Sequence, residues 1–295
     1  MDKAGGSRFR FEDSDDWLRH LEERGYAIVE NVMSGEEVAH ALQLLSDDLK
    51  HVTIQKNDPG LYPSLAQSRG AWFCRSRSGV KKAFSRIWNT EDLIVSMDAV
   101  IAWSSSQRPK SEGLHLDQNP IDKPNLDCIQ GMVPLLKVTM ESGGLEVVPG
   151  THQGTGREDL CKRYQHFKGK GDWCPLRRDD YLYSDAILLL AQPGDLILWD
   201  SRTVHGGRVP LQCSSDRDTK HDEIPNLIRL ACAVSMVPRS KATPAVLEAR
   251  RKGFDAGASF NHAPHEAGTS SGTLHARLPA SCMKPVLGKD ARQLL

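Results

Sequence analysis

Two histidines and one aspartate carry the strongest chemical signal in this chain. His115 and Asp117 stand two residues apart in GLHLDQNP (residues 113–120), and His205 stands far downstream in PGDLILWDSRTVHGG (residues 193–207). Because successive residues of a strand point to opposite faces, an H-x-D pair on a strand places both side chains on one face. With a distant histidine beside them, two imidazoles and a carboxylate could hold a transition metal.

An H-x-D pair alone is weak evidence, since such pairs occur by chance on protein surfaces. His205 strengthens it, because this residue follows an apolar strand at 196–199 and precedes Gly206 and Gly207, which leave space around the imidazole. The alternative is that His205 has no function and is a solvated histidine at a strand end. The complete set matches the facial triad of non-haem Fe(II) sites, which leaves coordination positions open for substrates.

Arg229 is the third chemical feature, in LIRLACAVSM (residues 227–236). Strand alternation places Arg229 on one face with the small residues Ala231, Ala233 and Ser235, and the larger apolar residues, Ile228 among them, on the other. A guanidinium heading a face of small residues indicates a cavity that binds a carboxylate in bidentate fashion. An arginine on an edge strand in solvent is the alternative.

The helices and strands that position these residues can be predicted in outline. Helices are predicted at 15–25 and after the capping box of Ser34 and Glu37, with a strand at 26–30 between them. Further strands are predicted at residues 93–103, 128–138, 145–148, 186–190, 195–199 and 227–237. This pattern predicts a mainly β protein with flanking helices (α+β), built on a double-stranded β-helix of the jelly-roll or cupin type.

We expect one domain over residues 1–295, with a helical N-terminal layer at about 10–90, a jelly-roll core at about 91–240 and an extension at about 241–295. Residues 154–185 are charged and irregular in pattern, which makes them a candidate lid or insertion. Residues 255–295 are rich in Gly, Ser, Ala and His, and are expected to wrap the surface or to be mobile.

Composition excludes several classes of function. The formal net charge is zero, so nothing points to nucleic acid, and the apolar runs are too short to cross a bilayer. The seven cysteines form no C-x-x-C pair, which argues against a structural zinc site or a disulfide framework. Without an apolar leader at residues 1–16, we expect an intracellular, cytoplasmic protein. The oligomeric state is not predicted.

Four stretches together resemble the phytanoyl-CoA dioxygenase family of Fe(II)/2-oxoglutarate oxygenases, over roughly residues 25–238. They are GYAIV (25–29) with the capped helix that follows, the H-x-D pair, ESGGLEVVPGTH (141–152), and residues 194–207 followed by Arg229. The third stretch, two glycines and then V-P-G-T-H, is the most specific of them. Its last residue, His152, closes this turn and is interpreted as structural.

The resemblance implies a role for each matching residue. His115, Asp117 and His205 would bind Fe(II), and Arg229 would bind 2-oxoglutarate. Because the polar residues 211–225 lengthen the connection between His205 and Arg229 relative to the family, Arg208 is the alternative for that role.

Other residues near the inferred iron are candidates for contacts with small molecules. Gln130, on a predicted strand, could face the co-substrate, whereas Gln118, Asn119 and Trp103 could contact the prime substrate. For the polar residues, a role in a turn or at a strand edge is an equal alternative. Trp103 could equally pack in the core.

The expected activity is oxidation of an unactivated C–H bond of a small molecule by O2, with 2-oxoglutarate converted to succinate and CO2. Hydroxylation is the expected outcome, while desaturation, ring formation and demethylation remain open. Two other classes also remain open, a catalytically silent cupin-like binding protein and a zinc hydrolase that uses the same triad. Substrate-dependent release of succinate distinguishes the oxygenase from both. The identity of the substrate is not predicted, because one fold supports many substrates.

Overall fold

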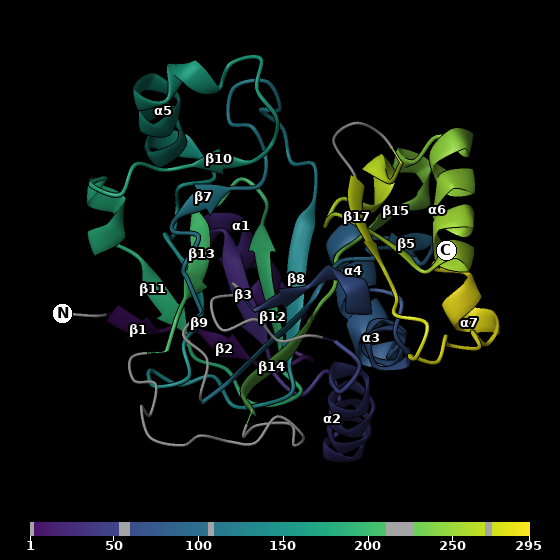
Figure 1. The fold of residues 1–295 in the computed structure, drawn as a ribbon. Helices are drawn as coiled ribbons and strands as arrows, with labels where there is room; N and C mark the ends of the chain where they lie inside the picture. The colour runs from purple at the N-terminus through teal and green to yellow at the C-terminus, as the bar shows by residue number, and fades with distance from the viewer. Residues whose placement is uncertain (1–2, 53–59, 106–108, 211–226, 269–272) are drawn as a thin grey trace.

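The protein is built on two large β-sheets with helices packed on one of them (Figure 1). The computed structural model describes residues 3–52, 60–105, 109–210, 227–268 and 273–295. The six-stranded sheet contains, in spatial order, β1 (Lys3–Gly5), β11 (Ile187–Leu189), β9 (Gly144–Val147), β13 (His205–Arg208), β7 (His115–Leu116) and β10 (Cys174–Pro175).

The second sheet has seven strands, again in spatial order: β2 (Arg8–Phe9), β3 (Tyr26–Val29), β12 (Leu196–Asp200), β8 (Ile129–Pro134), β14 (Leu227–Ala233), β6 (Val100–Ser104) and β4 (Leu61–Tyr62). Two smaller pairs are β15 (Met236–Pro238) with β5 (Leu93–Val95), and β16 (Ala258–Phe260) with β17 (Thr273–Arg277). The predicted mainly β architecture with flanking helices is confirmed.

The helices are α1 (Ser14–Arg24), α2 (Gly35–Leu49), α3 (Arg69–Arg75), α4 (Ser78–Trp88), α5 (Gly154–Arg163), α6 (Pro244–Ala256) and α7 (Lys289–Arg292). Helix α1 ends where Gly25 takes a left-handed φ of 79° and donates its N–H to the carbonyl oxygen of Leu21. The capping box of Ser34 and Glu37 begins α2, as predicted from the sequence. The predicted helical N-terminal layer is thus formed by α1 to α4.

Alternation along the central strands divides the core into two layers. On β12, Leu196 and Leu198 pack against the helices, whereas Ile197 and Trp199 face the space between the two large sheets. Every residue of β12 is buried, so this strand reads as a continuous apolar run in the sequence rather than as an alternating one. The space between the sheets is the part of the molecule that can hold a site.

Two of the predicted long strands are interrupted at the same level. Residues 93–103 form β5 and β6, and residues 227–237 form β14 and β15. Where both break, the Ser96 N–H donates to the carbonyl oxygen of Ser235 at 2.8 Å, and the Ser235 N–H donates to Ser96 Oγ at 2.9 Å. The hydroxyl takes the place of a backbone acceptor, so the strands separate without losing their hydrogen bonds.

Two segments are more regular in structure than their sequence patterns indicated. Residues 154–185 are not irregular: they contain α5 and β10, and β10 pairs with β7 beneath the lobe at the top of Figure 1. Residues 255–295 do more than wrap the surface, since β16 pairs with β17 and Phe260, Ala263 and Ala267 are buried. A charged segment and a segment rich in small residues each acquire structure by packing on the core.

Arg250 of α6 joins the C-terminal region to the core. Its side chain is fully buried, and it donates to the carbonyl oxygens of Val95, Pro264 and Leu294. Burial, with the nearby Arg239 and Arg75, lowers the pKa of Arg250 to about 9. The guanidinium therefore serves as a multiple hydrogen-bond donor that fixes three backbone segments relative to one another.

We expect Arg250→Met to lower the free energy of unfolding by about 3–5 kcal/mol, because each buried carbonyl left without a donor costs roughly 1–3 kcal/mol. Urea unfolding followed by circular dichroism measures this loss. Arg251→Met is the matched control. The Arg251 side chain is next in sequence, is 59% exposed and pairs only with Glu248 among the described residues. Equal stability of the two variants would contradict the structural role of Arg250.

Candidate metal centre

The strands β7 and β13 bring the two histidines together. They pair in an antiparallel register in which His115 lies directly opposite His205. His205 was expected at the end of the strand at 196–199, but it begins a strand of its own in the other sheet. Between Asp200 and His205 the chain crosses from one sheet to the other, which places His205 beside His115 rather than at a solvated edge.

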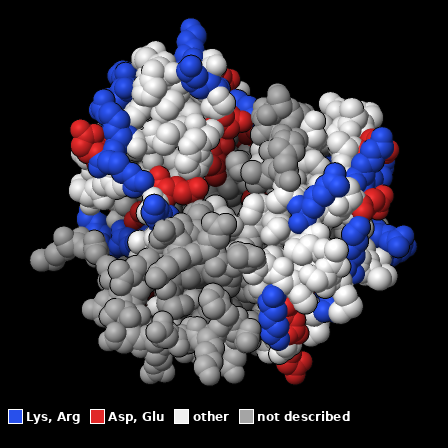
Figure 2. All heavy atoms as spheres, viewed as in Figure 1, with Lys and Arg blue, Asp and Glu red and all other residues white. Residues whose placement is uncertain are grey.

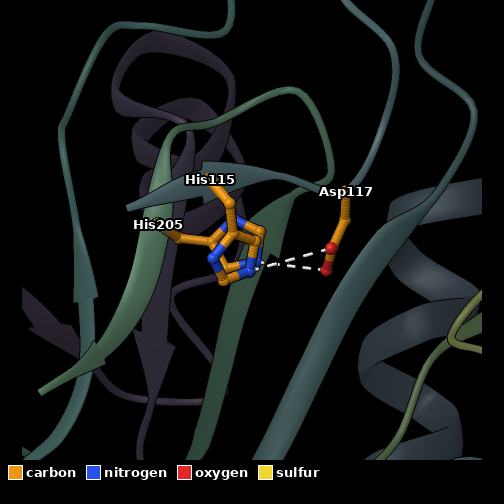
Figure 3. A group of neighbouring side chains, drawn as sticks. All are labelled: His115, Asp117 and His205. Atoms are coloured by element: carbon orange, nitrogen blue, oxygen red, sulfur yellow. Dashed lines mark hydrogen bonds and ion pairs between the residues drawn. The ribbon is translucent and has the colours of Figure 1, made fainter. Parts of the chain in front are cut away.

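Three potential ligand atoms converge on one point between the sheets (Figure 3). His205 Nε2 lies 3.2 Å from Asp117 Oδ2, and His115 Nε2 lies 3.7 Å from Asp117 Oδ1. Ligand atoms bound at right angles to one ion lie about 3 Å apart when each bond is roughly 2.1 Å. The three residues predicted from the sequence thus have the arrangement that a single metal ion requires.

The backbone fixes the orientation of both imidazoles in the same way. His115 Nδ1 lies 2.9 Å from the carbonyl oxygen of Gly113, and His205 Nδ1 lies 2.9 Å from that of Thr203. A carbonyl oxygen only accepts, so we assign the proton of each ring to Nδ1, which leaves Nε2 to face the centre. Burial, together with the neighbouring His205, lowers the pKa of His115 to about 4 against the opposing effect of Asp117.

The donor set fits a cation. Burial by itself raises the pKa of Asp117, but the nearby His262, His205 and His115 outweigh it and hold that pKa well below its usual value. An ionised carboxylate therefore faces the lone pair of a neutral imidazole at His115, an arrangement of two acceptors with no proton between them. A divalent metal ion at this point would satisfy both groups, and the buried site would favour binding further.

Gln130 of β8 supports the carboxylate. Its side-chain nitrogen donates to Asp117 Oδ2 at 3.1 Å, which fixes the carboxylate in position for the ion. Gln130 also lines the pocket described below. The expectation that this residue faces the co-substrate stays a prediction.

Gln118 and Asn119 lie away from the pocket, contrary to their predicted contact with substrate. The Gln118 side chain is hydrogen-bonded to the carbonyl oxygens of Lys123 and Asn125, and Asn119 donates to that of Phe167. Both side chains are buried, and neither lines the pocket. They close the turn after the H-x-D pair, so no substrate role is assigned to them.

A cavity of about 700 Å³ adjoins the three converging residues. Arg229 lies within it, 6% exposed, with its guanidinium 4.3 Å from the centre of the Trp103 ring and its Nη2 3.5 Å from Met132 Sδ. Its Nε has no hydrogen-bond partner among the described residues, and burial lowers the pKa of Arg229 to about 9. A buried cation without a counter-charge is suited to an anionic ligand.

The alternative arginine is already paired. Arg208 donates to Glu146 Oε2 at 2.8 Å and does not line the cavity. The predicted face of small residues is formed as expected, because Ala233 and Ser235 line the cavity together with Arg229. Ile228 was expected on the opposite face, but a register shift between Leu227 and Arg229 turns its side chain toward the space between the sheets.

Asp98, Trp173 and His262 also line the cavity, and the sequence assigned none of them to the site. Trp173 lies over the metal centre, with its ring 4.2 Å from that of His115, and is 49% exposed. His262 Nδ1 lies 3.8 Å from Asp117 Oδ2. No local pattern marks these residues, because each stands in an irregular segment that only the fold brings to the cavity.

A second group of possible ligands, Asp127, His265 and Glu266, lies nearby. Lys123 is within hydrogen-bond distance of Glu266, and its Nζ lies 3.8 Å from Asp127. Lys241 Nζ lies 3.7 Å from Asp127 on another side. Two ammonium groups already balance these carboxylates, so this cluster is an ion network that ties the C-terminal region to the turn after β7.

Comparison with known proteins agrees with this picture. The family model described as phytanoyl-CoA dioxygenase (PhyH) matches residues 21–209. Among curated proteins, "Ava biosynthesis cluster protein O" of Aspergillus versicolor is 25% identical over 284 residues, which cover 85% of this chain and 86% of that protein. No helix within the described ranges is long and apolar enough to cross a membrane.

Solved structures share the fold at low sequence identity. The epimerase SnoN, solved with Fe3+, alpha-ketoglutarate and nogalamycin RO, superposes with a TM-score of 0.55 at 14% identity, covering 95% of this chain and 97% of SnoN. The alpha-ketoglutarate-dependent carbocyclase SnoK superposes with a TM-score of 0.50 at 17% identity, covering 78% of this chain and 87% of SnoK. These matches confirm the predicted fold class.

Proposed function

This chain belongs to the phytanoyl-CoA dioxygenase family and is a 2-oxoglutarate-dependent non-haem iron enzyme, and on that premise we propose that it hydroxylates an unactivated C–H bond of a small-molecule metabolite. In this proposal His115, Asp117 and His205 bind Fe(II), and Arg229 binds the distal carboxylate of 2-oxoglutarate. When bound, the iron and 2-oxoglutarate would activate O2 for the oxidation of the substrate, with succinate and CO2 as co-products.

One observation carries the proposal: a buried arginine that faces no carboxylate among the described residues shares a cavity with three converging side chains that could hold a metal ion. Met132, which touches Arg229, stands two residues from Gln130, which touches Asp117. Side chains two apart on one strand face are separated by roughly 7 Å, which suits a single five-carbon diacid held at both ends. A zinc hydrolase or a silent binding protein has no need of this second anion site.

The residues of this chain would have different roles in the reaction. The two imidazoles and the carboxylate hold the metal on one side only, which leaves the cavity side open for 2-oxoglutarate, O2 and substrate. Gln130 keeps the carboxylate in place, and the surrounding apolar residues exclude water from the reacting centre. A small-molecule substrate is supported by the similarity to a protein of a biosynthesis cluster and by the size of the cavity.

We expect succinate formation that depends on Fe(II), 2-oxoglutarate and a substrate, and that a chelator abolishes. The measurement is a screen of candidate metabolites for stimulated succinate release, followed by mass analysis of the product. A gain of one oxygen atom supports hydroxylation. A loss of two hydrogens would indicate desaturation or ring closure, and an unchanged mass with altered stereochemistry would indicate epimerisation. Metal binding without any succinate formation would contradict the oxygenase assignment.

A further inference from the structure

The lining of the cavity includes Arg229, the candidate metal ligands and His262. Arg229 contacts Met132, Gln130 contacts Asp117, and Asp117 lies 3.8 Å from His262. These contacts lead from Arg229 to the candidate metal ligands and from there to His262. When 2-oxoglutarate occupies the Arg229 side, the part of the lining around His262 remains for a second molecule.

The interruption of the two long strands makes room for the part of the cavity around His262. β5 and β6 are separated by residues 96–99, and β14 and β15 are separated by residues 234–235. Asp98 and Ser235 come from these breaks, and both line the cavity. Had the strands continued regularly, the ladder would have closed over the space that these side chains now border.

Asp98 is held rigidly but retains an unused acceptor. Its Oδ1 accepts the Ala99 N–H at 2.7 Å, and its carbonyl oxygen accepts from Arg75 at 2.6 Å. Arg75 is fully buried and also donates to the carbonyl oxygen of Ala233 at 3.1 Å, across the same break. No partner for the second carboxylate oxygen of Asp98 is found among the described residues. Burial raises the pKa of Asp98, and the nearby His262 partly offsets that effect.

The charges in the cavity indicate which substrates fit. Fe(II) and Arg229 together would balance Asp117 and the two carboxylates of 2-oxoglutarate. Of the remaining acids in the described lining, Asp172 is paired with Lys123 at 2.7 Å, which leaves Asp98 and Glu112, and the remaining basic side chains there are Lys110 and His262. In Figure 2 carboxylates lie along the inner edge of the upper lobe, while Lys and Arg lie mostly along the periphery. Among the described residues, the region left for substrate therefore has no excess of positive charge.

Apolar side chains make up much of the remaining wall of the cavity, among them Ile101, Trp173 and Trp199. The partly exposed ring of Trp173 offers a flat surface beside the metal centre. Such a surface favours a mainly hydrocarbon molecule, and the few polar groups fix its orientation.

We propose that Asp98 selects the substrate, by accepting a hydrogen bond from a hydroxyl or ammonium group on a mainly hydrocarbon molecule that carries no net negative charge. This inference rests on the proposed function, because it assumes that 2-oxoglutarate occupies the Arg229 side. It excludes a coenzyme A thioester as the preferred substrate, since the phosphates of that molecule would meet uncompensated carboxylates.

The test uses three fluorescent probes that share one pyrene ring and carry a hydroxymethyl, an aminomethyl or a carboxylate group. The protein is loaded with 2-oxoglutarate and with Mn(II) in place of Fe(II), so that no turnover occurs. Dissociation constants are measured for the wild type, Asp98→Asn and the control Asp179→Asn, whose parent side chain is 88% exposed. Asparagine has the shape of aspartate and keeps an oxygen for the Ala99 N–H, so the change removes the charge and replaces the unused acceptor by an NH2 donor.

In the wild type, the aminomethyl probe should bind roughly 10- to 100-fold more tightly than the carboxylate probe, the range expected for a hydrogen bond to a charged group. Asp98→Asn should remove most of this preference, and Asp179→Asn should leave it unchanged. The inference is overturned if the carboxylate probe binds as tightly as the aminomethyl probe, if none of the probes binds, or if Asp98→Asn behaves like Asp179→Asn.

Separate titrations of the wild type with Mn(II) and with 2-oxoglutarate show which proposal has failed. Absence of either interaction contradicts the proposed function, whatever the probes do. Normal binding of both, with the wrong probe ranking, contradicts only the role of Asp98. The same titrations on Asp98→Asn report whether this variant keeps an intact metal centre.

Discussion

His115→Ala and His205→Ala are each expected to weaken Fe(II) binding by more than roughly 100-fold and to abolish succinate formation. Removing a group that merely supports a ligand typically costs about 10- to 100-fold in metal affinity, and removing a ligand itself costs more. Each imidazole is oriented toward the centre by a backbone carbonyl, so each variant loses a nitrogen that the fold holds in place. Anaerobic calorimetric titration with Fe(II), or with Mn(II) as a stable substitute, measures the effect.

His51→Ala is the matched control for this experiment, because His51 is exposed, follows the end of α2 and does not line the cavity. Its metal affinity should equal that of the wild type. Circular dichroism and urea unfolding of each variant separate loss of a ligand from loss of the fold. Metal affinity at the wild-type level in both His115→Ala and His205→Ala would show that the ion, if any, binds elsewhere.

Arg229→Ala should raise the 2-oxoglutarate concentration needed for half-maximal succinate formation by roughly two to four orders of magnitude. The change leaves a buried carboxylate without its partner, and breaking such a pair costs about 3–5 kcal/mol. Arg229→Lys should recover only part of the loss, since an ammonium group cannot reproduce the bidentate geometry of a guanidinium. Iron binding should survive both changes, because Arg229 is not a ligand.

Arg208→Ala is the decisive comparison, because this arginine is the alternative that the sequence leaves open. Its guanidinium is paired with Glu146 outside the cavity, so its removal should leave the response to 2-oxoglutarate unchanged. A large effect of Arg208→Ala combined with normal behaviour of Arg229→Ala would show that the co-substrate lies on the other side of β13, and would refute the assignment of Arg229.

Local sequence patterns predicted much of this protein. The strand at residues 26–30, the alternation along residues 227–236 and the capping box at Ser34 depend on neighbours in the chain, and the structure confirms nearly all of what they predicted. Residue type, spacing and strand alternation singled out His115, Asp117, His205 and Arg229, and the family resemblance implied a role for each. The one failure of alternation, at Ile228, comes from a bulge that leaves no mark on the pattern of apolar residues.

Irregular segments were predicted least well. Residues 154–185 and 255–295 lack strong periodicity, yet they supply Trp173 and His262 to the cavity. Their structure depends on contacts with distant parts of the chain, such as the pairing of β10 with β7 and the hydrogen bonds of Arg250. Gln118 and Asn119 failed for a related reason, since nearness in sequence to a ligand does not decide which way a turn directs its side chains.

The sequence by itself therefore determined the type of chemistry, because ligand type and strand spacing are local properties that identify a metal-binding triad. Only the tertiary structure decided what surrounds that triad. The shared break in two strands, the buried Arg75 that holds Asp98, and the pairing of Arg208 with Glu146 all join residues far apart in the chain. The shape and charge of the cavity arise from these long-range contacts, so the features that select a substrate cannot be read from any one segment.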